Sequence, residues 1–283
     1  MSNKLIEIPE NEWPILRDLY IHVQNSSCAY YVIQNYILLK ITNPEENIQI
    51  LSLNGDWKED GTFILQHCLI EPIYTFVNTL STNHERLLQA LQCLDNQKNL
   101  LLYGSQQNIK PTIDKYLYDL KIDTTSAYRT ILYHMNKEQA LQLSYDPFRI
   151  SNGVKLIKLE PRHAEKVNSI WSHRGPGTVA FVELLIRNYD GVGIIDETSS
   201  ELVAWCSRLP LGCLGFLQVM DSHKRLGLGS IMIRKLSHTL AKNNIEVMAP
   251  VVFDNVASRS LFEKLGFTVI DDVYWVLRPA KAT

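Results

Sequence analysis

The sequence predicts a mixed α/β (α+β) protein with two successive halves, and three observations indicate this. The chain has 283 residues, more than the ~100 to 200 that one domain usually takes. Short apolar runs of strand length alternate with segments of helical periodicity along the whole chain. The alternation breaks at residues 145–153, which contain Pro147 and the turn-forming sequence Ser151-Asn152-Gly153. We therefore expect one domain at 1–144 and another at 154–283.

The first half is expected to open with a helix and a strand meander. Pro9 suits a first helical position, and Leu16, Leu19 and Val23 follow at helical spacing. Turn signals then separate apolar runs, which is typical of antiparallel strands. In chain order we expect a helix at 9–24, strands at 36–41, 48–53 and 63–68, helices at 71–80 and 84–94, a strand at 99–103, a helix at 109–120, a strand at 127–134 and a helix at 137–143.

The second half repeats the alternation and leads into a glycine-rich turn. In chain order we expect a strand at 154–159, helices at 161–171 and 178–189, strands at 193–196, 202–207 and 214–219, a long helix after the glycine-rich turn, a strand at 247–253, a helix at 255–266 and a final strand.

Composition and charge exclude several classes of protein. The hydrophobic fraction of 46% predicts a folded core rather than disorder. A formal net charge of -2 gives no overall attraction to nucleic acid or to an anionic membrane, so we expect neither as a partner. The five cysteines are scattered without metal-ligand spacing, which favours a reducing compartment and no bound metal. No apolar stretch reaches the ~18 residues of a membrane span, and the start carries acids instead of a basic targeting signal. We expect a cytoplasmic protein.

A glycine-rich turn at residues 221–230 is the first candidate site. It follows the strand at 214–219 and opens a helix whose apolar residues recur at steps of four. Gly227 and Gly229 lack a Cβ, so an anion can approach backbone N–H groups that have no partner inside the helix. Lys224 and Arg225 add positive charge beside a helix N-terminus, which together would hold a pyrophosphate. The alternative is a plain strand-to-helix turn, because Gly-x-Gly alone is a weak signal.

A second motif gives the first its context. The segment from Asn255 to Phe267 reads as a helix that ends at Gly266, where a C-terminal glycine is favoured. The two motifs in this order resemble those of the GNAT superfamily of N-acetyltransferases, with Lys224 where that family usually has Arg or Gln. The resemblance implies a mixed, mostly antiparallel sheet flanked by helices, which holds acyl-CoA. The repeated alternation of strand-rich and helical segments predicts that the first half is a degenerate GNAT-like relative of the second.

A narrower resemblance covers nearly the whole chain. His163-Ala164, Val203-x-Trp205 and, in the first half, Gly55-Asp56-Trp57 followed by Phe63 are similar to the glycine N-acyltransferase-like family. That family implies acetyl-CoA or another acyl-CoA as co-substrate, without a metal, and a small amine such as glycine or another amino acid as acceptor. It also allows a mitochondrial location, although no transit peptide is visible. The cofactor-binding residues that the resemblances imply are Leu217, Val219, Lys224, Arg225, Leu226, Gly227, Leu228, Gly229, Ser230, Asn255, Ser258 and Phe262.

The side chains that move protons in this family are missing here. Direct attack by an amine on the thioester in a ternary complex needs a base, an acid for the leaving thiolate and an oxyanion donor. The family's Glu base aligns with Cys213 and its Tyr acid with Phe262, while a backbone N–H near Val219 is the expected oxyanion donor. The substitutes that we considered are His173, His223 and Tyr274, and we assign no catalytic residue.

Two alternatives to a small-molecule acyltransferase stay open. The first is a CoA-binding pseudoenzyme or interaction module, favoured by the missing Glu and Tyr. The second is a protein or peptide N-acetyltransferase, because the shared motifs bind CoA and say little about the amine. The first half has no Gly-x-Gly turn after any expected strand, so we expect it to bind no CoA.

Overall fold

A computed structural model describes residues 3–23, 27–123, 127–143 and 153–281 of the chain. The expected boundary at 145–153 therefore lies almost entirely outside the described residues. Contacts divide the chain into two compact units, one comprising Met1–Leu132 and Ile270–Thr283 and the other Tyr133–Val269. The first unit thus ends earlier than the expected 1–144 and also takes in the C-terminal segment. Among the described helices, none has the length and apolar character that crossing a membrane requires.

The first unit is built on a strand ribbon that the C-terminal end of the chain extends. β1 to β4 follow one another in antiparallel order, β5 runs parallel to β4, and β12 pairs antiparallel with β5. The strands are β1 (Leu5–Glu7), β2 (Ile48–Leu53), β3 (Phe63–His67), β4 (Ile73–Asn78), β5 (Leu100–Gln106), β6 (Tyr128–Met135) and β12 (Thr268–Arg278). The last two continue into the second unit.

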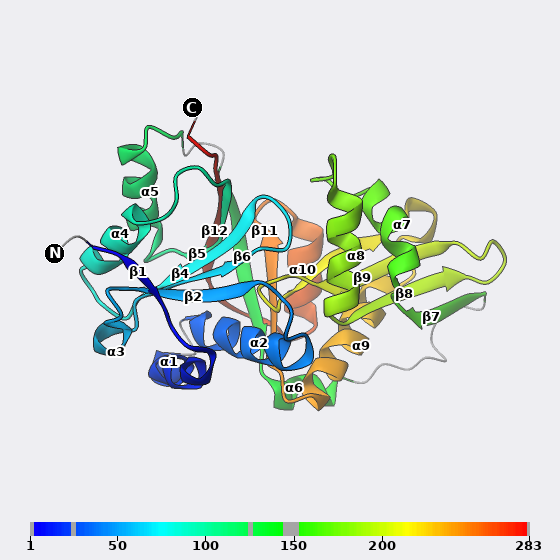
Figure 1. Ribbon diagram of the computed structural model, residues 1–283. Coiled ribbons are helices and arrows are strands. Elements are labelled where there is room, and N and C mark those ends of the chain that lie inside the picture. The colour runs from blue at the N-terminus through cyan, green and yellow to red at the C-terminus, as the bar shows by residue number, and fades with distance from the viewer. Residues whose placement is uncertain (1–2, 24–26, 124–126, 144–152, 282–283) are drawn as a thin grey trace. The chain divides into compact units, whose positions relative to one another are not determined.

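Helices cover both faces of this ribbon (Figure 1). They are the 3-10 turns η1 (Glu10–Glu12) and η2 (Ile21–Val23) and the helices α1 (Trp13–Leu19), α2 (Ala29–Thr42), α3 (Trp57–Asp60), α4 (Glu85–Gln92) and α5 (Lys110–Asp119). Leu87 and Leu91 of α4 and Ile113 of α5 pack with strand residues such as Ile64 and Leu102 in one apolar cluster. Burial of such side chains stabilises the unit by roughly 1.5–3 kcal/mol each.

The second unit holds a four-stranded antiparallel sheet in the order β10-β9-β8-β7. The strands of this sheet are β7 (Val154–Lys158), β8 (Gly191–Asp196), β9 (Leu202–Arg208) and β10 (Leu214–Val219). The other elements of the second unit are α6 (Lys137–Gln142), η4 (Pro161–His163), α7 (Ala164–Ser169), α8 (Thr178–Asn188), η5 (Asp221–His223), α9 (Leu228–Lys242), β11 (Val247–Val252) and α10 (Val256–Lys264). β11 does not join this sheet, since it pairs with β6. The described residues therefore confirm the expected mixed, mostly antiparallel sheet flanked by helices.

Two expected elements are wrong and one strand was not expected. Residues 36–41 lie in α2, because Val32, Ile33, Tyr36 and Leu39 are buried at helical spacing. Residues 71–80 were expected as a helix but contain β4, where alternate side chains face opposite sides of the ribbon. β1 has three residues and carried no periodic signal. The other expected helices and strands are present with shifted ends.

Candidate functional site

The glycine-rich turn joins β10 to α9, as expected. Gly227 is the N-cap of α9 and has a left-handed backbone with φ of 78°. Among the described residues, no acceptor receives a hydrogen bond from the backbone N–H groups of residues 225–230. The next N–H, that of Ile231, donates to the Gly227 carbonyl at 3.2 Å. The turn therefore presents a run of unsatisfied donors at the positive end of the helix dipole.

The space around the turn is open at Gly227 and narrow at Gly229. A Cβ added at Gly227 would meet no atom within 4 Å, so a ligand can reach this backbone. A Cβ at Gly229 would lie 3.3 Å from Leu261 Cδ2 and 3.9 Å from Val219 Cγ2. Leu261 belongs to α10, so the structure brings the two sequence motifs together at this turn. Donors and open space at a helix N-terminus form an anion-binding arrangement.

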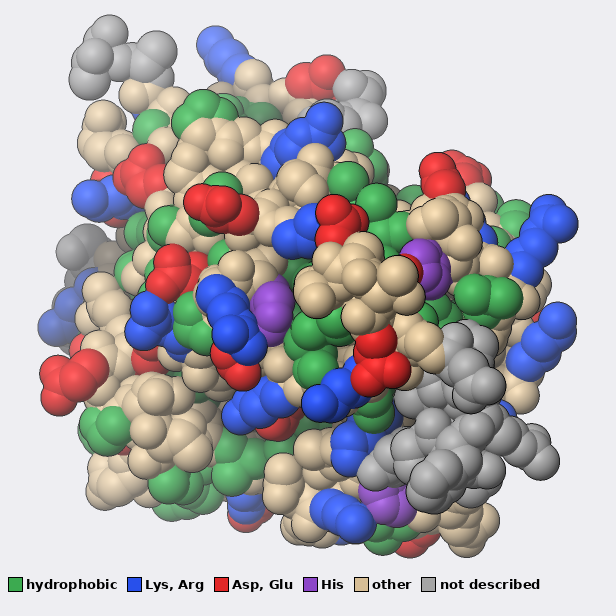
Figure 2. All heavy atoms as spheres, turned by 90° about the vertical axis from the view of Figure 1, so that its right-hand side faces the viewer, with side chains coloured by type: hydrophobic (Ala, Val, Ile, Leu, Met, Phe, Trp, Pro, Cys, Tyr) green, Lys and Arg blue, Asp and Glu red, His purple; other side chains and the backbone are tan. Residues whose placement is uncertain are grey.

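Arg225 is better placed than Lys224 to add charge. Lys224 Nζ lies 2.5 Å from Asp221 Oδ1, and this hydrogen bond lowers the pKa of Asp221. Arg225 is exposed, has φ of 65°, and forms no ion pair with any described residue. On the face shown in Figure 2, acidic and basic side chains lie interspersed. At the turn itself, the backbone N–H groups of residues 225–230 and the exposed Arg225 are the groups that could hold an anion.

The strand that leads into the turn lies at the edge of its sheet. β10 is the last strand of the four-stranded sheet, and β11 pairs on its other side with β6, so β10 and β11 are not paired with each other. The register of β10 against β9 shifts between Gly215 and Gln218, and Phe216 has φ of 52°. We call residues 216–217 the β10 bulge. Bulges of this kind often lie next to active sites, where they redirect backbone and side-chain groups.

The second motif caps α10 as expected. The Asn255 side chain accepts a hydrogen bond from the Ser258 N–H at 3.1 Å. The helix ends with φ of 90° at Gly266, and the Phe267 N–H bonds to the Phe262 carbonyl at 3.1 Å. Phe262 was expected along the pantetheine arm. Its ring is buried, stacked on Tyr133 with centroids 5.9 Å apart and packed edge-on against Phe267.

The residues considered for catalysis do not form one cluster. Cys213 is 1% exposed. Its thiol lies close to the buried guanidinium of Arg208, and burial lowers the pKa of that guanidinium. His173 is exposed and packs edge-on against Trp171 at 5.7 Å. His223 belongs to the glycine-rich turn, and its Nε2 lies 3.4 Å from Asp196 Oδ2. Tyr274 belongs to the first unit, where its hydroxyl donates to Gln107 Oε1 at 2.5 Å.

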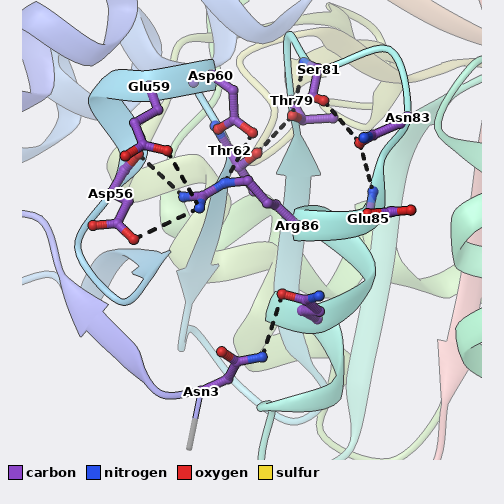
Figure 3. A network of polar contacts seen from close by, with 12 residues as sticks. Asn3, Asp56, Glu59, Asp60, Thr62, Thr79, Ser81, Asn83, Glu85 and Arg86 are labelled. Carbon is purple, nitrogen blue, oxygen red and sulfur yellow. Dashed lines mark hydrogen bonds and ion pairs between the residues drawn. The ribbon is translucent and has the colours of Figure 1, made fainter. Parts of the chain in front are cut away.

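The first unit contains a comparable strand-to-helix turn, between β4 and α4, in which side chains of the turn accept several backbone N–H groups. The Thr79 N–H bonds to Asn78 Oδ1, the Ser81 N–H to Thr79 Oγ1, and the Glu85 N–H to Asn83 Oδ1. In this turn (Figure 3), Arg86 lies within 3.1–3.7 Å of carboxylate oxygens, which belong to Asp56, Glu59 and Asp60.

The helix caps of the two turns differ in the same way. The N-cap of α4 is His84, which has a left-handed backbone like that of Gly227. The imidazole Nδ1 of His84 is 3.1 Å from Thr112 Oγ1, so a side chain fills the position that is empty at Gly227. The two turns therefore share a backbone form at the cap but differ in whether a side chain occupies the space beside it.

Comparisons with known proteins agree with this fold. The family model of FR47-like proteins matches residues 191–276. No curated protein matches the chain. An X-ray structure of a Drosophila protein from a structural genomics programme is 19% identical, covering 97% of this chain and 98% of that chain, with a TM-score of 0.87.

Two further structures carry GNAT names. A tandem GNAT protein from the clavulanic acid biosynthesis pathway, solved without acetyl-CoA, is 11% identical, covering 99% of each chain, with a TM-score of 0.59. A GCN5-related N-acetyltransferase from Sphaerobacter thermophilus is 8% identical, covering 99% of this chain and 96% of that chain, with a TM-score of 0.57. At these identities the likeness shows the fold, which is a tandem GNAT fold.

Proposed function

We propose that this chain is an acyl-CoA-dependent N-acyltransferase that moves an acyl group from CoA to the amine of a small acceptor such as glycine or another amino acid. The observation that carries the proposal is the run of backbone N–H groups without acceptors at residues 225–230, around open Gly227. Such donors at a helix N-terminus match the charge of a pyrophosphate. In the comparable turn of the first unit, side chains accept three backbone N–H groups and His84 is the helix cap, so the two turns differ in their surroundings.

Exposed apolar side chains occur in the turn, at the end of β11 and at the start of α10. Leu226 in the turn, Val252 at the end of β11 and Val256 at the start of α10 are all exposed. Apolar groups left in solvent beside an anion site fit a ligand with a charged end and a less polar arm. CoA has that composition, with a pyrophosphate at one end and a pantetheine arm at the other.

The reaction would proceed by direct attack within a ternary complex. The amine nitrogen bonds to the thioester carbon, the carbon–sulfur bond breaks, and a proton from the amine ends on the thiolate or in solvent. Orientation of two bound reactants can contribute roughly 7 to 11 kcal/mol to lowering the barrier. We propose the β10 bulge as the source of the oxyanion donor, since its backbone departs from the register with β9.

A CoA-binding module without catalysis is the second candidate. It is favoured by Cys213, which is buried where the family has its base, and by Phe262, which has no hydroxyl and is buried against Tyr133. The two candidates agree on CoA binding and differ on thiol release. A measurement of thiol release therefore distinguishes the two candidates, whereas a measurement of CoA binding tests both.

Calorimetric titration with acetyl-CoA and longer acyl-CoAs tests the binding. Gly227→Leu should weaken binding at least tenfold, or about 1.4 kcal/mol, because its side chain would fill the open space above the donors. Lys224→Ala should weaken it less than threefold, because exposed ion pairs contribute about 0–1 kcal/mol and Lys224 is held by Asp221.

A matched control exists for the Gly227 variant. Gly177 is also the left-handed N-cap of a helix, with φ of 80°, and a Cβ there would meet no atom within 4 Å. Gly177→Leu introduces the same backbone strain without touching the turn, so acyl-CoA affinity should stay within a factor of two. If no acyl-CoA gives heat or a thermal shift, the proposal is wrong. If acyl-CoAs bind but no amine in a broad screen releases free thiol, the binding module is the correct function.

A further inference from the structure

Three aromatic rings lie on one face of the four-stranded sheet, beginning at the β10 bulge. The Phe216 and Trp171 ring centroids are 4.9 Å apart, and Trp171 stacks on Phe181 at 5.9 Å with 25° between the planes. We call Phe181, Trp171 and Phe216 the ring stack. Phe181 is buried, whereas Trp171 and Phe216 are half-buried. The stack therefore runs from the core outward to the open edge of β10.

The strained backbone of the bulge is what brings Phe216 into this stack. A bulky residue rarely adopts φ near 52°, so surrounding packing must hold it there. Phe216 packs against the apolar cluster that contains Trp205 of β9 and residues of α7 and α8, such as Val182. Val219, further along β10, lies instead beside Gly229 at the start of α9. The ring stack and the glycine-rich turn therefore lie toward opposite faces of β10.

The position of the ring stack relates it to the acyl group. Phe216 directly precedes Leu217 in the β10 bulge, where the proposed oxyanion donor lies. A ligand held by its pyrophosphate at residues 225–230 and extended along β10 would bring its thioester to this bulge. The acyl chain that continues beyond the carbonyl would then meet Phe216 and Trp171. Because the two rings are in contact with each other, the chain would meet them as one surface without space between them.

We propose, resting on the proposed function, that Phe216 and Trp171 close the acyl end of the site and restrict the transferred group to short chains such as acetyl. The occupant of this apolar surface is thus the acyl group of the CoA ester bound at the adjoining turn. A pocket that lacks room for extra methylene groups discriminates by roughly 10–200-fold per step of size. Removing one of the two rings should make room for a longer acyl chain.

The test compares dissociation constants for acetyl-CoA and octanoyl-CoA by calorimetry, together with thiol release wherever an acceptor is found. The wild-type protein should bind acetyl-CoA at least tenfold more tightly than octanoyl-CoA. Phe216→Ala should reduce that ratio at least tenfold, mainly by tightening octanoyl-CoA, and Trp171→Ala should act in the same direction. Trp171→Phe, which keeps a ring, should change it less.

Val182→Ala is the matched control, because Val182 is buried in the same cluster but lies on α8 and not in the ring stack. It should lower the melting temperature without changing the ratio of dissociation constants. If both esters bind and Phe216→Ala leaves the ratio unchanged, or if the wild type prefers octanoyl-CoA, this inference is wrong and the proposed function stands. If neither ester binds, both are wrong.

Discussion

One residue at each helix cap distinguishes the glycine-rich turn from the comparable turn of the first unit. Gly227 and His84 adopt the same left-handed backbone at the N-caps of α9 and α4. The energetic cost of that conformation is small for glycine and larger for histidine, yet both turns keep it. With His84, the imidazole contacts Thr112 and neighbouring side chains take up the N–H groups. With Gly227, no side chain occupies the corresponding position, and the backbone there is open.

A buried histidine should make stability depend on pH at the residue scale. His67 is fully buried, and burial lowers its pKa although Glu46, 3.1 Å away, opposes the shift. Below its unfolded pKa of about 6.5, the unfolded chain therefore binds a proton before the folded chain does. The stability contributed by neutral His67 is present above that pH and is lost as pH falls toward the lowered folded pKa.

Urea unfolding at pH 7.5 and 5.5 measures this contribution. The free energy of unfolding should fall between these two conditions, and the fall should be smaller in His67→Gln. His22→Gln is the control, because His22 is exposed and should leave the fall unchanged. An equal fall in wild type and His67→Gln would contradict the prediction.

Residue types at the candidate site could be read from the sequence, but their surroundings could not. Gly227, Gly229 and the Asn255 cap follow from local chain conformation, which is why their spacing was informative. The burial of Phe262 against Tyr133 depends on a strand far away in sequence. The φ of Phe216 likewise depends on the register between β10 and β9, which no local pattern encodes.

At the scale of elements, the C-terminal strand should be required by the first unit. In β12, Val273, Val276 and Arg278 are buried, and residues 273–278 pair with β5. Ending the chain at Val269 would expose the edge of β5 and remove apolar burial of roughly 1.5–3 kcal/mol for each valine. The truncated chain should melt at a lower temperature, and a peptide of residues 268–283 should restore part of the loss.

A shorter truncation provides the control for that experiment. Ending the chain at Pro279 keeps all of β12 and removes only contacts of the tail, such as the Ala280 N–H to Asn99 Oδ1. Its melting temperature should stay close to that of the full chain. If the chain ending at Val269 melts like the full chain, β12 is not needed by the first unit.

Helices and strands were predicted correctly where one periodicity dominated the sequence. The predictions were wrong where helical and strand patterns competed. α9 and α4 have clear apolar faces, and both were expected at their positions. In α2, the run Tyr36 to Ile41 contains an aromatic residue and β-branched residues, which favour strands locally, but burial at helical spacing from Ala29 onward prevails. In β4, the residues Ile73 to Val77 are strong strand formers, and pairing with β3 and β5 overrides the helical pattern first inferred.

At the scale of the whole molecule, two units of one fold have different capacities to bind a ligand. In the first unit, β4 and β5 pair over Ile73–Thr75 and Leu100–Leu102. Beyond this pairing, the Asn78 side chain donates to Gln106 Oε1 at 3.3 Å, and the Cys28 N–H donates to the same oxygen at 3.2 Å. Hydrogen bonds thus connect β4 and β5 beyond their backbone pairing, whereas β10 and β11 are not paired with each other.

The chain should therefore bind one acyl-CoA molecule, and calorimetric stoichiometry or native mass spectrometry measures this. Gly227→Leu should remove the binding, since the first unit offers no replacement site. His84→Gly should leave the stoichiometry at one per chain, because the Thr79, Ser81 and Glu85 N–H groups keep their acceptors without the imidazole. Two binding events per chain, or undiminished binding in Gly227→Leu, would mean that the first unit also binds the ligand.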